Sequence, residues 1–335
     1  MIKKIQRLLK SSSKVIITTH KNPDGDAMGS SLALNSILNK IGIESIVIIP
    51  NAYPSNLNWM EGVKDVVNYD LDSKNATKLI ENAELIFCLD FNSLKRVGNM
   101  SKFIKNSKAK TILIDHHEDP ELIFDFSYSF PKISSTCQLI YEFLIELNLI
   151  EYIDIKIAEN LYTGIVTDTG SFKYSSVDIR THQIVSNLLL IGLKQDQIHN
   201  KLHNNQKEKR LKLLGYAINK KLKIYYNFNT AIIDLSINEL NMFDYERGDT
   251  DGIINYALSI EKISLAVIFI EEKDKIKISF RSKNNFKTNI LSKKYFNGGG
   301  HINASGGIYY GKIEDGIKKL ISILPNYKTE LSKNT

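Results

Sequence analysis

The sequence predicts an α/β protein: an N-terminal doubly wound, mostly parallel sheet and a smaller C-terminal α/β domain, with a cleft between them. Three observations lead to this expectation. The chain has 335 residues, more than a single hydrophobic core usually serves. Apolar runs alternate with helical patterns through the first half, which is typical of a parallel sheet covered by helices. The second half contains further strand patterns and a glycine-rich segment, residues 297–307.

Four apolar runs in the first half are candidates for buried strands. They cover residues 15–19, 41–50, 84–90 and 110–117. Their apolar residues are consecutive rather than alternating, which indicates strands buried on both faces. Helical patterns occupy residues 27–40, 76–83, 134–147, 154–166 and 181–191.

A strongly polar stretch from Gly192 to Leu222 indicates the connection between domains. We predict a first domain over residues 1–192, a linker over 193–215 and a second domain over 216–330. The second domain has strand patterns at 222–228, 230–235, 263–270 and 275–281, and a helical pattern at 290–296. The tail from Lys328 to Thr335 is expected to be disordered.

Charge and cysteine content limit the class of function. The formal net charge of +7 suits anionic ligands such as nucleotides, although lysine-rich surfaces are common without such ligands. Cys88 and Cys137 lie in apolar sequence without CxxC spacing, which argues against disulfides and thiolate zinc sites and fits a cytoplasmic location. No apolar run is long enough to span a membrane, so we expect no membrane partner. A homodimer is one assembly that the sequence allows.

Side chains that can bind a metal ion follow three of the four predicted strands and one predicted helix. The carboxyl ends of parallel strands meet at one edge of a sheet, where ligands bind in folds of this class. We therefore expect these side chains to converge on one metal site. The candidate ligands are His20, Asp24, Asp26, Asp90, His116 and Asp168.

The first group of ligands has an alternative interpretation. Asp26 could cap the helix that follows, Asp24 could be a turn residue after Pro23, and His20 could bond to the backbone. Convergence of several strand ends favours the metal site. Carboxylates about 4 Å apart repel by roughly 1 kcal/mol per pair in water and by more in a partly dry cleft. Such a cluster needs a cation or raised pKa values.

The donor set predicts two divalent ions. It contains oxygen and nitrogen but no sulfur, which suits Mn²⁺ or Mg²⁺, and two imidazoles favour Mn²⁺. The negative charge of four carboxylates would be neutralised by two divalent ions. Asp90 is the carboxylate that we expect to bridge the two ions. Adjacent residues of an extended chain point to opposite sides, so we assign His116 to a metal ion and His117 to the substrate phosphate or the leaving group. Asp115 is expected to orient a histidine.

A second place of interest is the glycine-rich segment. Three consecutive glycines, Gly298, Gly299 and Gly300, precede His301 and a small-residue segment that we expect to be helical. Glycine allows close backbone approach, so successive N–H groups can bind an anion. The alternative is a helix C-cap followed by a mobile turn. Arg281 and Ser282 end a predicted strand of the same domain. His199 and His203, spaced i, i+4, could bind zinc, but a solvated linker helix is favoured.

Together these segments resemble the DHH phosphoesterase superfamily over nearly the whole chain. The matching motifs are His20-Lys-Asn-Pro-Asp24-Gly-Asp26, Leu89-Asp90, Asp115-His116-His117, Asp168-Thr-Gly170 and Gly298-Gly299-Gly300-His301. Length and domain order look like the bifunctional oligoribonuclease and 3′-phosphoadenosine-5′-phosphate (pAp) phosphatase group, which is called NrnA-like. Asn297 and Pro120 depart from residues that many relatives carry.

The resemblance implies a two-metal hydrolase, usually Mn²⁺-dependent. One ion would be held by His20, Asp24 and Asp90, and the other by Asp26, Asp90, His116 and Asp168. The second domain would bind the nucleotide through Arg281, Ser282, Gly300 and His301. The expected reactions are hydrolysis of short oligoribonucleotides to mononucleotides and of pAp to AMP. The alternative substrate is a linear or cyclic dinucleotide such as diadenylate.

Overall fold

The computed structural model describes residues 1–246 and 248–333 and divides into two compact units, Met1–Asn205 and Gln206–Thr335. The predicted linker, residues 193–215, contains a helix of each unit. Ile198 and Leu202 of α8 (Gln195–His203) pack into the core of the first unit, and Leu213 of α9 (Glu208–Tyr216) packs into that of the second. The functional limits of the two domains stay predictions.

The first unit contains a parallel sheet, as predicted. Its described strands lie in the order β3-β2-β1-β4-β5-β6, and every neighbouring pair is parallel. Strands β3 and β6, which the sequence did not predict, are short strands at the two edges. The strands are β1 (Val15–Thr19), β2 (Ser45–Ile49), β3 (Val67–Asn68), β4 (Leu85–Leu89), β5 (Lys110–Asp115) and β6 (Phe126–Ser129).

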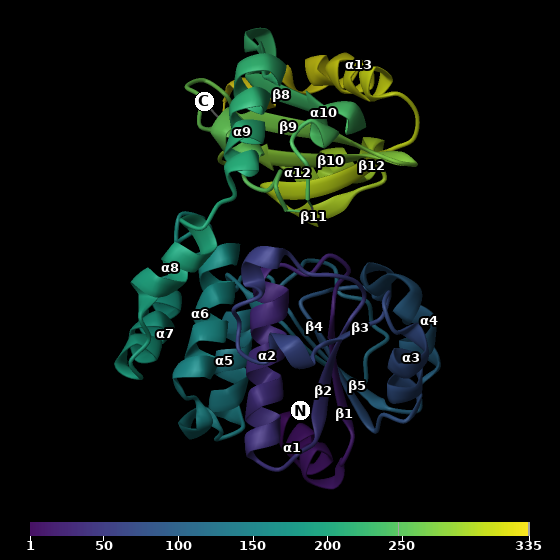
Figure 1. Cartoon of the computed structure of the whole chain (residues 1–335), viewed down its shortest axis with the longest axis vertical. Helices are drawn as coiled ribbons and strands as arrows, with labels where there is room; N and C mark the ends of the chain where they lie inside the picture. The colour runs from purple at the N-terminus through teal and green to yellow at the C-terminus, as the bar shows by residue number, and fades with distance from the viewer. Residues whose placement is uncertain (247, 334–335) are drawn as a thin grey trace. The chain divides into compact units, whose positions relative to one another are not determined.

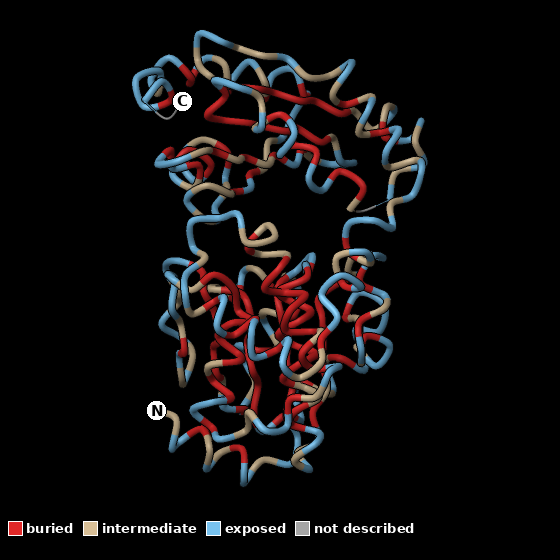
Figure 2. The backbone as a smooth tube through the Cα atoms, turned by 90° about the vertical axis from the view of Figure 1, so that its left-hand side faces the viewer, coloured by how far each residue is buried: buried red, intermediate tan, exposed pale blue. Residues whose placement is uncertain are grey.

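Helices cover both faces of this sheet (Figure 1). One face packs against α1 (Ile2–Ser11), α2 (Gly25–Lys40), α5 (Thr136–Glu146) and α6 (Ile155–Asp168), with α7 (Ile179–Leu190) and α8 outside them. The other face packs against α3 (Ser73–Glu81), α4 (Ser101–Asn106) and the 3₁₀ segment η3 (Leu94–Met100). Buried residues are concentrated in the central strands and the helix faces that cover them (Figure 2). Because helices cover both faces of the sheet, side chains on both faces of its central strands are buried, which explains why these strands are apolar without alternation.

Small residues bring α2 and α6 unusually close together. A Cβ atom on Gly29 would lie 2.5 Å from the carbonyl oxygen of Asn160, and a Cβ atom on Gly25 would lie 2.4 Å from Oγ1 of Thr167. Only glycine fits at such contacts. The close packing carries the C-terminal end of α6, where Asp168 lies, to the N-terminal end of α2.

The second unit contains a mixed sheet. Its described strands lie in the order β11-β12-β10-β9-β8-β7, with β8 and β9 parallel and the other pairs antiparallel. The strands are β7 (Lys223–Tyr225), β8 (Thr230–Leu235), β9 (Leu265–Glu272), β10 (Lys275–Ser282), β11 (Gly299–His301) and β12 (Ala304–Tyr309). The predicted α/β class of this half of the chain is confirmed.

Helices pack on both faces of the second sheet as well. One face packs against α12 (Thr288–Tyr295), α13 (Ile313–Ile323) and α14 (Lys328–Ser332). The other packs against α9, α10 (Ile237–Asn241) and α11 (Ile253–Leu258). Short turns of other helix types lie at Ser55–Leu57, Val63–Asp65, Ile150–Tyr152, Ala217–Lys221, Tyr226–Phe228 and Leu324–Tyr327.

Two expectations for the second half were wrong. The tail from Lys328 was expected to be disordered, but it forms α14, because Leu331 is buried in the core; Asn334 and Thr335 lie outside the described residues. The small-residue segment after His301 is strand β12, not a helix. The glycines of β12 allow this segment to pair with both β10 and β11. Pairing within the sheet therefore determines the conformation of the segment, and its intrinsic helix propensity does not.

Candidate metal centre

The loop after β1 places three candidate ligands at the carboxyl edge of the first sheet. Asp24 is the N-cap of α2, and its Oδ1 accepts hydrogen bonds from the N–H groups of Asp26 (3.0 Å) and Ala27 (3.1 Å). The alternative that Asp26 caps the helix is therefore wrong, because Asp24 has that position. Its second oxygen, Oδ2, lies 3.9 Å from Nε2 of His20, so Asp24 caps the helix and faces the histidine at once.

Asp26 turns inward and is fully buried. Its Oδ2 accepts the N–H of Thr136 at 2.6 Å, and its Oδ1 accepts the N–H of Cys137 at 2.8 Å. Both donors lie in the first turn of α5, where backbone N–H groups have no partner within the helix. Thr136 was not among the predicted site residues. The small polar run Ser134-Ser135-Thr136 just before the apolar helix was the signal that could have revealed it.

Asp90 lies between two imidazoles. Its Oδ2 lies 3.3 Å from Nε2 of His20, and its Oδ1 lies 3.4 Å from Nε2 of His116. Oδ1 also accepts a hydrogen bond from Oγ1 of Thr136 at 2.9 Å. The backbone φ of Asp90 is +62°, a left-handed conformation that non-glycine residues rarely adopt and that often marks a functional site.

A backbone carbonyl orients the ring of each ligand histidine through Nδ1. Nδ1 of His20 lies 2.9 Å from the carbonyl oxygen of Lys21, and Nδ1 of His116 lies 3.1 Å from that of Ile133. A carbonyl can only accept, so each Nδ1 carries a proton, and Nε2 is the nitrogen that would bind a metal ion after giving up its own proton. Nε2 of His116 also lies 3.2 Å from Oδ2 of Asp168, at the end of α6.

Among the groups of side chains that could hold a metal ion, two consist of predicted ligands alone. In each set, one ligand atom per residue lies within 4.8 Å of the others. The sets are His20, Asp24 and Asp90, and Asp26, His116 and Asp168. They share the neighbourhood of Asp90, and their oxygen and imidazole donors fit Mn²⁺ or Mg²⁺.

The charges of the cluster shift its pKa values strongly. Burial, with the negative charges of Asp90 and Asp168, raises the pKa of Asp26 well above its ordinary value. Burial raises the pKa of Asp168 to about 7. Burial acts in the same direction on Asp90, but hydrogen bonds from His116 and His20 outweigh it and hold the pKa of Asp90 well below its ordinary value. A buried group with this much unrelieved negative charge is a candidate functional site.

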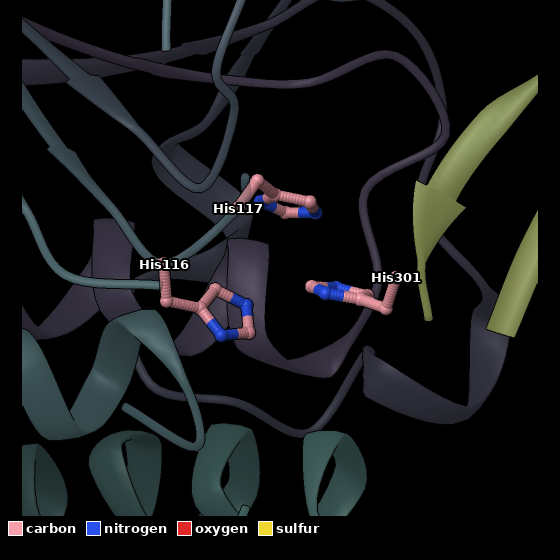
Figure 3. Close-up of side chains that lie close together, drawn as sticks. All are labelled: His116, His117 and His301. Atoms are coloured by element: carbon pink, nitrogen blue, oxygen red, sulfur yellow. The ribbon is translucent and has the colours of Figure 1, made fainter. Parts of the chain in front are cut away.

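His117 has a different environment from His116, although they are neighbours in the chain. The ring centroids are 4.9 Å apart (Figure 3). Nδ1 of His117 lies 2.7 Å from Oδ1 of Asp115, which is completely buried, so Asp115 orients this ring. Burial lowers the pKa of His117. Nδ1 of His117 also lies 3.8 Å from Oδ1 of Asp90, so both rings lie near Asp90, and the separate assignments of the two histidines stay a prediction.

In the second unit, cross-strand pairing determines on which face of the sheet the predicted substrate-binding residues lie. His301, which ends β11 (Figure 3), is opposite Ala304 of β12, and Ala304 is opposite Arg281 of β10. Directly opposite residues point to the same face, so His301 and Arg281 share one face of the sheet. Arg281 also lines a cavity of about 110 Å³ with residues that include Lys277 and Ser279.

Ser282 lies on the opposite face from Arg281, because side chains alternate along a strand. It is buried; its hydroxyl donates to the carbonyl oxygen of Phe286 at 2.6 Å and accepts from Nδ2 of Asn303 at 2.9 Å. These contacts indicate a structural position, and a role of Ser282 in substrate binding stays a prediction.

The three glycines before His301 differ in what they require. A Cβ atom on Gly298 would lie 1.9 Å from the carbonyl oxygen of Gly306, and Gly300 has φ +137°. Gly299 has open space around it. An exposed glycine surface of this kind lets a ligand approach the backbone.

His199 and His203 belong to none of the possible metal-binding groups found in the described part of the chain. Nε2 of His199 instead lies 3.1 Å from the hydroxyl of Tyr162. No helix among the described residues is both long and apolar enough to cross a membrane.

Comparisons with known proteins agree with these observations. The DHH family, N-terminal domain, matches residues 14–165, and the DHHA1 domain matches residues 231–326. The bifunctional oligoribonuclease and PAP phosphatase NrnA of Bacillus subtilis (strain 168) is 28% identical over 297 residues, which cover 88% of this chain and 89% of that protein.

Solved structures show the same relationship. The crystal structure of an exopolyphosphatase-related protein from Bacteroides fragilis has a TM-score of 0.94 and 41% identity, covering 98% of this chain and 97% of that one. RecJ of Thermus thermophilus, solved in complex with Mn²⁺, has a TM-score of 0.53 and 11% identity, covering 98% of this chain and 55% of that one, and shows the fold alone. The chain belongs to the DHH family, with an N-terminal DHH domain followed by a DHHA1 domain.

Proposed function

We propose that the protein is a phosphoester hydrolase that degrades short oligoribonucleotides to mononucleotides and converts pAp to AMP. The observation that carries the proposal is the position of Asp90, whose two oxygens face His20 and His116 from two different ligand sets. The relatives named NrnA in Bacillus subtilis, Streptococcus mutans and Thermus thermophilus, at 26–28% identity over most of the chain, support the two substrates.

Two divalent ions, with Mn²⁺ favoured, are part of the proposal. His20, Asp24 and Asp90 would hold one, and Asp26, His116 and Asp168 would hold the other, with Asp90 between them. When bound, such ions neutralise the charge of the phosphoryl group and lower the pKa of water. The preference for Mn²⁺ over Mg²⁺ rests on the two imidazole ligands, His20 and His116.

The chain's own residues would orient the substrate and move a proton. Asp115 accepts the proton of Nδ1 of His117, so Nε2 is the atom that can exchange a proton with the leaving oxygen. Arg281 and His301, on one face of the second sheet, would bind a phosphate of the substrate that is not hydrolysed. Because Gly298, Gly299 and Gly300 have no side chains, that phosphate could approach their backbone N–H groups.

Substrate specificity can be tested with the purified protein. We expect Mn²⁺-dependent release of mononucleotides from 5′-phosphorylated dinucleotides and of phosphate from pAp. Chelation should abolish both activities, and re-addition of Mn²⁺ should restore them. Absence of turnover on both substrates across Mn²⁺ and Mg²⁺ would contradict the proposal.

The alternative substrate is a linear or cyclic dinucleotide. Its support is the cyclic-di-AMP phosphodiesterase GdpP of Bacillus subtilis, which is 26% identical over 348 residues but of which this chain covers only 49%. Linear and cyclic diadenylate therefore belong in the same substrate series. Faster hydrolysis of cyclic diadenylate than of the linear dinucleotide would favour this alternative.

A cytoplasmic location is also proposed, since Cys88 and Cys137 are both buried and free. A homodimer stays a prediction, which the molar mass in solution will test.

A further inference from the structure

The loop after β4 carries a cation to the edge of the metal centre. This loop begins at Asp90 and continues into η3, which Ser93 caps. Within η3, the carbonyl oxygen of Arg96 accepts the N–H of Lys21 at 2.6 Å. Because Lys21 follows His20 directly, this hydrogen bond fixes the backbone of Arg96 beside a candidate metal ligand.

A second set of contacts holds the same loop to the segment that follows His117. The hydroxyl of Ser93 donates to Oε1 of Glu121 at 2.6 Å, and the N–H of Leu94 donates to Oε2 of the same carboxylate at 3.1 Å. Nδ2 of Asn92 donates to the carbonyl oxygen of Glu118 at 2.6 Å. The start of η3 is therefore attached both to the loop of His20 and to the loop of His117.

Arg96 is half-buried as a residue, and its guanidinium lacks a carboxylate partner among residues 1–246 and 248–333. Arg180, by contrast, pairs with Glu142 through two short contacts, from Nε at 2.6 Å and from Nη2 at 2.8 Å. Burial lowers the pKa of His117, and the positive charge of Arg96 acts in the same direction. Burial also acts to lower the pKa of His20, but the hydrogen bond with Asp90 and the nearby carboxylates outweigh it and raise that pKa, against the opposing charge of Arg96. The charge of Arg96 therefore acts on both imidazoles.

An arginine in this position suits an anionic ligand. Its planar fork of N–H donors matches phosphate oxygens, and a charge-assisted pair of this kind is among the stronger hydrogen bonds in proteins. Glu121, the carboxylate in these anchoring contacts, accepts hydrogen bonds from Ser93 and Leu94 and is not paired with Arg96.

We infer that Arg96 binds a non-bridging oxygen of the phosphoryl group that is hydrolysed, and that it favours doubly charged phosphomonoesters over singly charged phosphodiesters. This inference rests on the proposed function. At neutral pH a phosphomonoester, such as the 3′-phosphate of pAp, carries nearly two negative charges, because its second pKa is about 6. The diester of a dinucleotide carries one, and Coulomb attraction to a fixed cation grows with the charge.

The test compares Arg96→Gln, Arg96→Lys and the control Lys95→Gln. Lys95 is the exposed neighbour in the same η3 segment. For Arg96→Gln we expect kcat/KM on pAp to fall about 10- to 100-fold, as for a lost hydrogen bond to a charged group. The loss on a 5′-phosphorylated dinucleotide should be several-fold smaller. Arg96→Lys should retain part of the preference for pAp, and Lys95→Gln should match the wild type on both substrates.

A binding measurement separates this inference from the proposed function. Calorimetric titration with inorganic phosphate, in the presence of Mn²⁺, should show weaker binding for Arg96→Gln but not for Lys95→Gln. Mn²⁺ affinity and thermal stability should match the wild type in all three variants. Equal losses on the two substrates together with unchanged phosphate binding would overturn the role of Arg96. A wild-type protein that hydrolyses neither substrate overturns the proposed function, whereas the phosphate titration still decides whether Arg96 binds an anion.

Discussion

A Cβ atom on Gly164 of α6 would lie 2.7 Å from Oδ1 of Asp26 on α2. The helix backbone therefore packs directly against a candidate metal ligand. The same Cβ atom would lie 2.2 Å from Sγ of Cys137, which is also buried. Since neither neighbour has free space to move into, the absence of a side chain at Gly164 controls the position of Asp26.

Gly164→Ala should consequently weaken the metal centre. We expect a loss of about 1–3 kcal/mol in the free energy of unfolding from overpacking. We also expect about 10- to 100-fold weaker Mn²⁺ binding, as for other changes that displace a ligand. Gly215→Ala is the matched control, because Gly215 lies in α9 with nothing near its Cβ position. Calorimetry and denaturant unfolding measure both effects, and wild-type Mn²⁺ affinity in Gly164→Ala would contradict the account.

Asp90→Asn tests the residue between the two ligand sets. Asparagine tolerates the left-handed backbone, so the fold should be retained. Hydrolysis should fall roughly 10³-fold or more, because several kcal/mol of transition-state stabilisation depend on the bound ions. The control is Asp244→Asn, an exposed aspartate of the second unit with φ +45°. The number of Mn²⁺ ions bound, measured by atomic absorption after gel filtration, should fall in Asp90→Asn only; an unchanged rate would remove Asp90 from the site.

Metal binding should depend on pH through Asp168. In the metal-free protein burial raises the pKa of Asp168 to about 7, so below that pH its carboxyl group carries a proton. That proton must leave when a divalent ion binds, so the apparent affinity should fall as the pH falls through about 7. Calorimetry in two buffers of different ionisation enthalpy should detect more protons released at pH 6 than at pH 8. Equal proton release at both values, with the protein folded by circular dichroism, would contradict this prediction.

Glu239 should stabilise the second unit in a pH-dependent way. Burial acts to raise its pKa, but hydrogen bonds from Ser236, Tyr216 and Lys221 outweigh it and lower the pKa to about 2. The pKa is depressed in the folded state, so the stabilisation is complete above the ordinary value of 4.5 and is lost as the pH falls towards 2.

Glu239→Gln should therefore cost about 2 kcal/mol at pH 7 and progressively less below pH 4.5, in urea unfolding followed by fluorescence. Glutamine at this position can still complete the capping box with Ser236, so the difference in unfolding free energy between the variant and the wild type measures the effect of the lost charge. Glu314→Gln, an exposed change in the first turn of α13, is the control and should stay within about 0.5 kcal/mol. If the difference in unfolding free energy were the same at pH 7 and pH 3, the stabilisation would not depend on the ionisation of Glu239.

Much of the fold follows from sequence patterns alone. The continuous apolar runs that became β1, β4 and β5 indicated strands buried on both faces, since water contacts neither face of a central parallel strand. The edge strands β3 and β6 carry too few apolar residues to show such a pattern. The conformation of β12 depends on pairing with strands β10 and β11 rather than on its own composition.

The candidate site was likewise predictable from the sequence only in part. Residue type and position at strand ends sufficed to nominate His20, Asp90 and His116, because the carboxyl ends of parallel strands share one edge. Only the tertiary structure decided that Asp24 caps α2, that Thr136 holds two carboxylates, and that Ser282 faces away from Arg281. Local sequence specifies which chemical groups are present, whereas long-range packing, as at Gly164, specifies the distances between them.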